Sequence, residues 1–312
     1  MRMNSLSWCM VLVILLVSSG VILCSIDYLS VLDSDYFLLL ISLSQFVMLS
    51  FVIPNDLIIV IINRDWLGLI SYLLINFWAS KTKSGIKAVV YNQVGDPSFS
   101  MIIAFPYSFL PLINYSPFLS FSMSNVMLLF YPLPTSSLVI LSLSFIFIFF
   151  SKSAMLPLSS RLLNAIAAPT PVSSLLHSST MVIAGVYLGL IMQPIIMLVV
   201  NILYTIFIIL LVVPIFTLIW SVFKAISLSD IKSMIAFSTI SQISYMFLAI
   251  PTGLTLVPLF HIVIHAAFKS LLFLLSGSLI HVQSNFQSIY KQKINHSFIK
   301  TSGMLYALIK FS

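Results

Sequence analysis

Long apolar runs separated by short polar breaks dominate the pattern of this 312-residue chain. About nine or ten of the runs reach the length at which a helix crosses the ~30 Å hydrocarbon core of a membrane. They are continuous, whereas the strands of a membrane β-barrel alternate over about ten residues. The pattern therefore predicts an all-α polytopic membrane protein. The predicted transmembrane segments are residues 7–26, 36–54, 56–79, 86–112, 136–158, 171–192, 198–223, 231–250 and 254–280, with a shorter one near 298–311.

Prolines inside these runs predict discontinuous helices. Pro157 follows Lys152 by five residues within one apolar run, and it cannot donate the hydrogen bond that the helix needs there. We therefore expect the helix to break or kink one turn beyond Lys152. Further on, Thr170 is a suitable N-cap and Pro171 a suitable first residue of a new helix that carries His177. Broken helices at membrane depth line enclosed cavities, so these two breaks predict a polar interior path.

Composition strengthens the membrane assignment. Hydrophobic residues make up 60% of the chain, charged residues only 7%, and the mean hydropathy is +1.16, whereas a soluble domain averages about a quarter charged residues. The net charge of +7 comes from fourteen basic and seven acidic residues, all aspartates. Basic residues in short loops serve membrane topology and bind anionic headgroups. We therefore expect contacts with membrane lipids and no nucleic acid.

Asp65 and Lys152 are two of the few charged residues placed deep in apolar runs, where each charge costs at least ~2.5–3.5 kcal/mol. Arg64, the neighbour of Asp65, lies about 100° away around a helix, so we expect the two not to face each other. Asp65 then needs a basic partner from another helix, and Lys152 is the natural candidate. A pair shielded from lipid could release and regain protons as its spacing changes. The alternative is a static ion pair that fixes helix packing.

The segment "HIVIHAAFKSLLF" places His261, His265 and Lys269 at positions i, i+4 and i+8. On a helix they span only about 80° of one face and climb ~6 Å per step. This spacing suits a proton wire, because histidine titrates near neutral pH. A zinc site is one alternative, but the segment lacks the HExxH glutamate and the chain offers no clustered cysteine or glutamate ligand. Hydrogen bonding between helices without transport is the other alternative.

No GxGxxG, P-loop, CxxC pair or haem-type motif is present in the sequence. We therefore expect no nucleotide, flavin, iron–sulfur or metal site in this chain. If the protein belongs to a redox complex, the electrons travel through other subunits.

Several motifs closely resemble those of the chain 5 family of proton-pumping NADH:ubiquinone oxidoreductase, respiratory complex I. The motifs are "APTPVSSLLHSSTMVIAGVYL" (168–188), "DIKSMIAFSTISQISYMFLA" (230–249) and "FHIVIHAAFKSLLFLLSGS" (260–278), with "LGLISYLL" (67–74) and "KSAMLPL" (152–158). They occur in the order of the family and extend from about residue 56 to 290. The large subunit of multisubunit cation/proton antiporters shares these motifs and is the alternative family.

The resemblance implies one antiporter-like transmembrane domain over residues 1–312, with discontinuous helices and part of an inverted five-helix repeat. It implies that Asp65 is the intramembrane carboxylate, Lys152 the central lysine and His177 the linking histidine of the broken helix. It also assigns His261, His265 and Lys269 to the further histidine pair and the lysine that follows.

The chain departs from the family pattern at several positions. Arg64 and Trp66 stand beside Asp65 where the family usually has tryptophan and glycine, Gln93 replaces an arginine, and Asn164 replaces an aspartate. The family's chain is also much longer, with helices before and after the present segment. We therefore expect a split or truncated subunit, with complementary fragments of the same subunit on other polypeptides.

The resemblance implies a proton-translocating subunit that couples NADH:ubiquinone electron transfer, located elsewhere in complex I, to proton pumping. NADH, FMN, iron–sulfur clusters and ubiquinone would then be bound by other subunits, and the partners would be other membrane-arm subunits. Alternatives are the large subunit of a cation/proton antiporter and an inactive structural fragment of the membrane arm. The absence of glutamate and the Phe-, Ser- and Leu-rich composition favour an organelle gene and the mitochondrial inner membrane, with a bacterial plasma membrane as the alternative.

Overall fold

The architecture comes from a computed structural model of the chain, in which part of the sequence is described. Lys152 and His177 are described in their backbone only, as are Phe145 and Phe149. The described residues are 5–28, 34–54, 57–77, 82–98, 100–101, 135–159, 162, 166, 168–178, 183–193, 196–197 and 204–282.

The long described elements are all α-helices, as the apolar pattern predicts. Their bounds agree closely with the predicted segments at 7–26, 36–54, 231–250 and 254–280. The helices are α1 (Ser5–Tyr28), α2 (Ser34–Val52), α3 (Leu57–Ile75), α4 (Thr82–Val94), α7 (Thr135–Lys152), α9 (Thr170–Ser178), α10 (Ile183–Ile191), α12 (Tyr204–Ser227), α13 (Ile231–Ala249) and α14 (Leu256–Val282).

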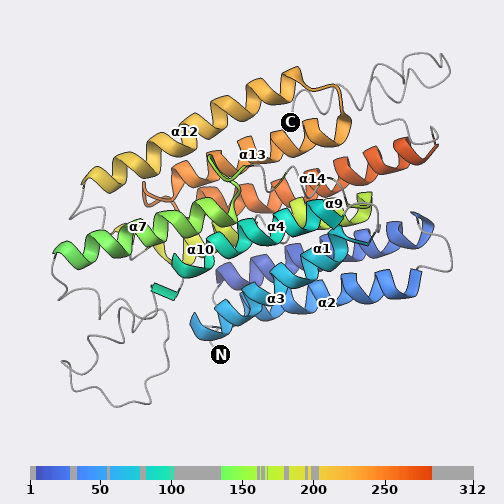
Figure 1. The fold of residues 1–312 in the computed structure, drawn as a ribbon, viewed down its shortest axis with the longest axis horizontal. Coiled ribbons are helices and arrows are strands. Elements are labelled where there is room, and N and C mark those ends of the chain that lie inside the picture. Colours follow the sequence, from blue (N-terminus) through green and yellow to red (C-terminus); the bar gives the residue numbers. More distant parts are fainter. Residues whose placement is uncertain are drawn as a thin grey trace.

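The helices lie side by side with their axes roughly aligned (Figure 1). α12 forms one edge of the bundle and packs on α13, which packs in turn on α14. The paired helices α2 and α3 lie toward the opposite edge, and α1 joins the two sides through contacts with α2, α9 and α14. The short helix α9 packs on α14, and α4 contacts both α3 and α7. The helices that carry the predicted site residues therefore belong to one bundle.

Four of the described helices are long and apolar enough to cross a membrane by themselves, so the chain is a multi-pass membrane protein. The short helix α10 is buried over all but one of its nine residues, as expected of a helix that is apolar on every side. α12 instead exposes large side chains such as Phe216 and Phe223. The four spans are Leu6–Ile26, Asp35–Val52, Tyr204–Ser227 and Leu256–Ile280.

The predicted break after Lys152 is confirmed and comes earlier than expected. α7 ends at Lys152 itself. Ala154 adopts a left-handed backbone with φ of 55°, and the N–H of Met155 donates to the carbonyl of Phe150 at 3.1 Å. This is the Schellman pattern that closes a helix C-terminus. Pro157 follows it at a position where no helix needs to continue.

The start of α9 differs from the prediction by one residue. Thr170 is the first residue of the helix and not the N-cap before it. The N–H of Ser173 donates to the carbonyl of Pro169 at 3.0 Å, so the helical bonding begins one residue earlier. The hydroxyl of Thr170 has no hydrogen-bond partner among the described residues. It faces Gly277 of α14, where a Cβ would lie 2.6 Å from the threonine Oγ1. Close packing on α14, and not capping, therefore explains this threonine.

Two other predicted segments need correction. The segment 86–112 begins earlier, because α4 starts at Thr82, and a turn at Gly95 interrupts it after Val94. Residues 96–98 and 100–101 are again helical, and the predicted end of the segment lies outside the described residues. The segment 171–192 contains two helices, α9 and α10, with residues 179–182 outside the described part of the chain. The short segment near 298–311 also lies outside the described residues.

Hydroxyl groups in the apolar helices bond mainly to their own backbone. Ser44, Ser71 and Ser244, for example, donate to the carbonyl three residues earlier at 2.6–2.7 Å. Such bonds satisfy a hydroxyl without a partner from another helix. Hydrogen bonds within one helix therefore satisfy most of the serines in the apolar runs. A hydroxyl that bonds a side chain of another helix is an exception.

Candidate functional site

The row predicted on one face of α14 is present, and two of its members bond side chains of α13. His261 Nε2 lies 2.8 Å from Gln242 Oε1. The Nζ of Lys269 donates to Ser238 Oγ at 2.9 Å. Because an amide oxygen only accepts, Nε2 of His261 carries the proton in this arrangement. The polar row therefore faces α13 rather than lipid.

His265 lies between these two residues and is the most enclosed imidazole of the row. Its exposed fraction is 4%, and neither ring nitrogen has a hydrogen-bond partner among the described residues. Its ring centroid lies 6.5 Å from that of His261. A buried polar group without a hydrogen bond is costly, and native proteins retain few of them. This imidazole therefore calls for a functional explanation.

α13 carries many hydroxyl side chains, and its sequence alone does not indicate which of them contact the row on α14. Ser238 and Gln242 lie four residues apart, on one face of the helix, and they meet Lys269 and His261 respectively. Ser238 also donates to the carbonyl of Ile235 at 2.8 Å, which leaves its oxygen to accept from the lysine. Their shared face was the available signal, but only the packing of α13 on α14 identifies them as partners.

Lys232 is a buried cation that the sequence interpretation missed. It is buried near the start of α13, and its Nζ lies 3.5 Å from the carbonyl of Ala168, just before α9. Its position two residues after Asp230 resembles that of a helix-end lysine that reaches water. The contact with Ala168 places it instead beside the entry of the helix that carries His177.

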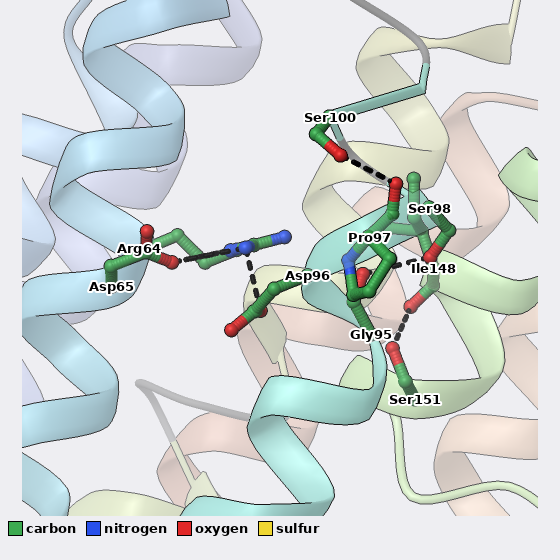
Figure 2. Close-up of polar contacts among 9 residues, drawn as sticks. All are labelled: Arg64, Asp65, Gly95, Asp96, Pro97, Ser98, Ser100, Ile148 and Ser151. Atoms are coloured by element: carbon green, nitrogen blue, oxygen red, sulfur yellow. Dashed lines mark hydrogen bonds and ion pairs between the residues drawn. The ribbon is translucent and has the colours of Figure 1, made fainter.

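A second polar region lies where α3 meets α4 (Figure 2). The guanidinium of Arg64 donates to Asp65 Oδ1 through Nε at 3.1 Å and Nη2 at 3.0 Å. The same Nη2 lies 2.6 Å from Oδ1 of Asp96, which follows α4. Arg64 thus joins two carboxylates that belong to different helical segments.

The prediction that Arg64 and Asp65 do not face each other is therefore wrong. The 100° separation describes where the side chains leave the helix, and the arginine side chain is long enough to reach back around it. Asp65 is also not enclosed by this chain, because 56% of its side chain is exposed, against 4% for Arg64. The predicted pair of Asp65 with Lys152 stays a prediction, because the lysine side chain lies outside the described residues.

The backbone positions of Lys152 and His177 agree with the expected discontinuities. Lys152 is the last residue of α7, and His177 is the last but one of α9. Their proposed roles depend on side chains outside the described residues. α4 lies between Asp65 and the end of α7, because it contacts both α3 and α7. At this contact a Cβ on Gly95 would lie 2.8 Å from the Cβ of Ser151, the residue before Lys152.

The zinc alternative receives no support from the part of the chain that the structure describes. There, no group of three or more His, Cys, Asp or Glu side chains is placed to hold a metal ion. His261 is bonded to an amide and Lys269 to a hydroxyl. The row thus consists of two titratable side chains that bond neutral side chains of α13, with His265 between them on α14.

The fold and these polar rows define a class of protein. The sequence profile of the NADH:quinone oxidoreductase/Mrp antiporter transmembrane family matches residues 54–308. The chain therefore belongs to this family, and its fold is an antiporter-like helical bundle.

Two curated relatives and one solved structure make the comparison more specific. NADH-ubiquinone oxidoreductase chain 5 of Chondrus crispus is 36% identical over 316 residues, covering 98% of this chain and 46% of the relative. NADH-quinone oxidoreductase subunit L of Escherichia coli is 36% identical over 252 residues, covering 78% of this chain and 39% of the relative. The Mrp complex from Dietzia sp. contains a chain that matches this one with a TM-score of 0.71 at 22% identity. The match covers 88% of this chain and 30% of the Mrp chain, and it shows a shared fold. The chain spans less than half the length of these two relatives.

Proposed function

We propose that this chain is a proton-translocating, antiporter-like subunit of an NADH:quinone oxidoreductase. The row His261–His265–Lys269, in which His265 and Lys269 are buried and His261 is half-buried, is the observation that supports it best, together with its partners Gln242 and Ser238 on α13. Titratable groups cost free energy inside a membrane and are retained there mainly for transport. The names of the relatives, which are subunits of NADH:quinone oxidoreductases, favour this complex over other antiporter-like assemblies.

In this proposal the chain moves protons and carries no redox group. NADH, FMN, iron–sulfur clusters and ubiquinone bind to other subunits of the complex. Asp65 and Lys152 form a switchable charge pair, His177 passes protons toward the second half of the path, and the α14 row continues it. Spacings of about 6 Å along a helix are bridged by rotation of side chains and by water.

The proposed setting is the mitochondrial inner membrane, with a bacterial plasma membrane as the alternative. The partners are other membrane-arm subunits, and complementary fragments of the same subunit supply the portions that the longer relatives contain. Co-purification from native membranes tests both points. An NADH-oxidising arm in the purified complex supports the proposal, whereas a complex without one supports a cation/proton antiporter, which shares the fold.

Transport is tested with Lys152→Met in membrane vesicles that contain the assembled complex. We expect the protons moved per NADH oxidised to fall by at least about tenfold, which corresponds to ~1.4 kcal/mol in the transport barrier. Lys224→Met is the matched control, because Lys224 is an exposed lysine in the last turn of α12. An unchanged ratio in an assembled Lys152→Met complex would instead identify the chain as a structural scaffold.

A further inference from the structure

Arg64, Asp65 and Asp96 form an ion group between α3 and the end of α4 (Figure 2), called here the α3–α4 ion group, and Arg64 is its most enclosed member. Its side chain is 4% exposed, whereas Asp65 is 56% and Asp96 34% exposed. The cation thus lies inside the bundle, and the two carboxylates approach it from the periphery. A guanidinium presents several N–H groups in a fixed plane, which allows it to hold two carboxylates at once.

The Asp96 side of this group is fixed by close packing. Gly95 forms the turn that ends α4, with its N–H donating to the carbonyl of Asn92 at 3.1 Å. Ser98 Oγ donates back to the carbonyl of Gly95 at 2.7 Å. A side chain at position 95 would collide with Ser151 of α7. The carboxylate that Arg64 holds is therefore attached to the point where α4 touches the end of α7.

The contact between Gly95 and Ser151 lies next to Lys152. Ser151 Oγ donates to the carbonyl of Ile148 at 3.0 Å within the last turn of α7, and Lys152 is the next residue in the chain. A displacement of Asp96 toward or away from Arg64 would move the Gly95 turn against this last turn. Arg64 is thus placed to connect the charge on Asp65 with the position of the α7 end.

We infer that Arg64 is a positioning residue for proton transport. Its guanidinium holds Asp65 and Asp96 as one ion group and thereby couples the α3 carboxylate to the α4–α7 contact beside Lys152. The inference rests on the proposed transport function. It assigns to Arg64 no proton of its own, because guanidinium keeps its charge in proteins.

The test compares Arg64→Gln and Arg64→Lys with the unmodified chain in vesicles that contain the assembled complex. The measured quantity is the number of protons moved per NADH oxidised, normalised to the amount of assembled complex. We expect Arg64→Gln to lower this ratio by about tenfold and Arg64→Lys by about threefold, because lysine keeps the charge but lacks the planar fork. Lys87→Gln, an exposed charge removal on α4, should leave the ratio unchanged.

Three outcomes separate the possibilities. A merely structural arginine would reduce the amount of complex and leave the ratio unchanged in whatever assembles, and that result overturns the inference. If Arg64→Gln does not assemble, Arg64→Lys decides, and a ratio equal to that of the unmodified chain overturns the inference. Lys152→Met is measured in parallel. If it also leaves the ratio unchanged, the transport function itself fails, whereas an effect of Lys152→Met alone rejects only the role of Arg64.

Discussion

The α13–α14 contact and the α3–α4 contact both place a cation inside an apolar bundle, but they surround it with different groups. Lys269 meets a hydroxyl, and the imidazoles of His261 and His265 lie on the same helix. Arg64 meets two carboxylates. A lysine bonded to a hydroxyl can lose its proton and keep a neutral hydrogen bond, whereas an arginine between two carboxylates holds them in place. The first arrangement suits proton transfer, and the second suits positioning.

The largest expected difference between the two regions is in stability. Arg64→Met should destabilise the assembled protein by about 3 kcal/mol, the lower end of the cost of losing one partner of a buried pair, because its carboxylates stay partly exposed. Lys269→Met should change stability by less than about 1 kcal/mol, because methionine fills the site and the hydroxyl of Ser238 that loses its partner carries no charge. Thermal unfolding of the purified complex measures both. Equal losses would contradict the distinction between the regions.

Ser238→Ala probes the neutral partner of Lys269. Removing the hydroxyl leaves the ammonium without this hydrogen bond, and bonds to charged groups contribute about 1.5–3 kcal/mol. We therefore expect Ser238→Ala to destabilise the protein by about 2 kcal/mol, which lies within this range, and to slow proton transport. The control is Ser233→Ala on the same helix, because Ser233 is half-buried and bonds only the carbonyl of Asp230 in the described residues. If Ser233→Ala lowers the stability as much as Ser238→Ala does, the effect does not depend on the bond with Lys269.

Two close glycine contacts, of Gly277 on α14 with α9 and of Gly95 after α4 with α7, leave no room for a side chain. A Cβ on Gly277 would lie 2.6 Å from Thr170 Oγ1, and one on Gly95 2.8 Å from Ser151 Cβ. Gly277→Ala and Gly95→Ala should each destabilise by about 1–3 kcal/mol, the usual cost of overpacking. Gly20→Ala is the control, because nothing lies within 4 Å of its added Cβ, and it should stabilise α1 by up to about 1 kcal/mol.

Ala154→Gly gives the smallest expected effect and tests the end of α7. Ala154 has φ of 55°, and a left-handed conformation costs a residue with a Cβ about 1 kcal/mol. Glycine should therefore raise the stability by about that amount. Proton transport should stay unchanged if the Schellman turn only closes the helix beside Lys152. A loss of stability would show that this turn is not the one described.

Much of the fold follows from the sequence, because apolar length determines where helices form in a membrane. The ends of α2, α13 and α14 agree with the apolar runs within a few residues. The break after Lys152 was predictable from Pro157, since proline cannot continue the helix. The exact start of α9 was not, because Thr170 meets Gly277 of α14, and no local pattern contains a contact between residues so far apart.

The site was predictable in part. The helical spacing of His261, His265 and Lys269 was enough to place them on one face of α14. Their partners on α13 depend on how two helices pack, which spacing within one helix does not determine. The α3–α4 ion group was missed for a related reason. The direction of Cβ says little about where the end of a long arginine side chain lies.

The role of the α14 row in proton transport is tested most directly by the complex that carries Lys269→Met. Proton transport is measured per NADH oxidised in sealed vesicles, with Lys224→Met as the control. We expect the assembled variant to oxidise NADH and to move at least about tenfold fewer protons per NADH, while Lys224→Met behaves like the unmodified chain. A Lys269→Met complex that assembles and retains the full proton ratio would show that the α14 row does not carry protons.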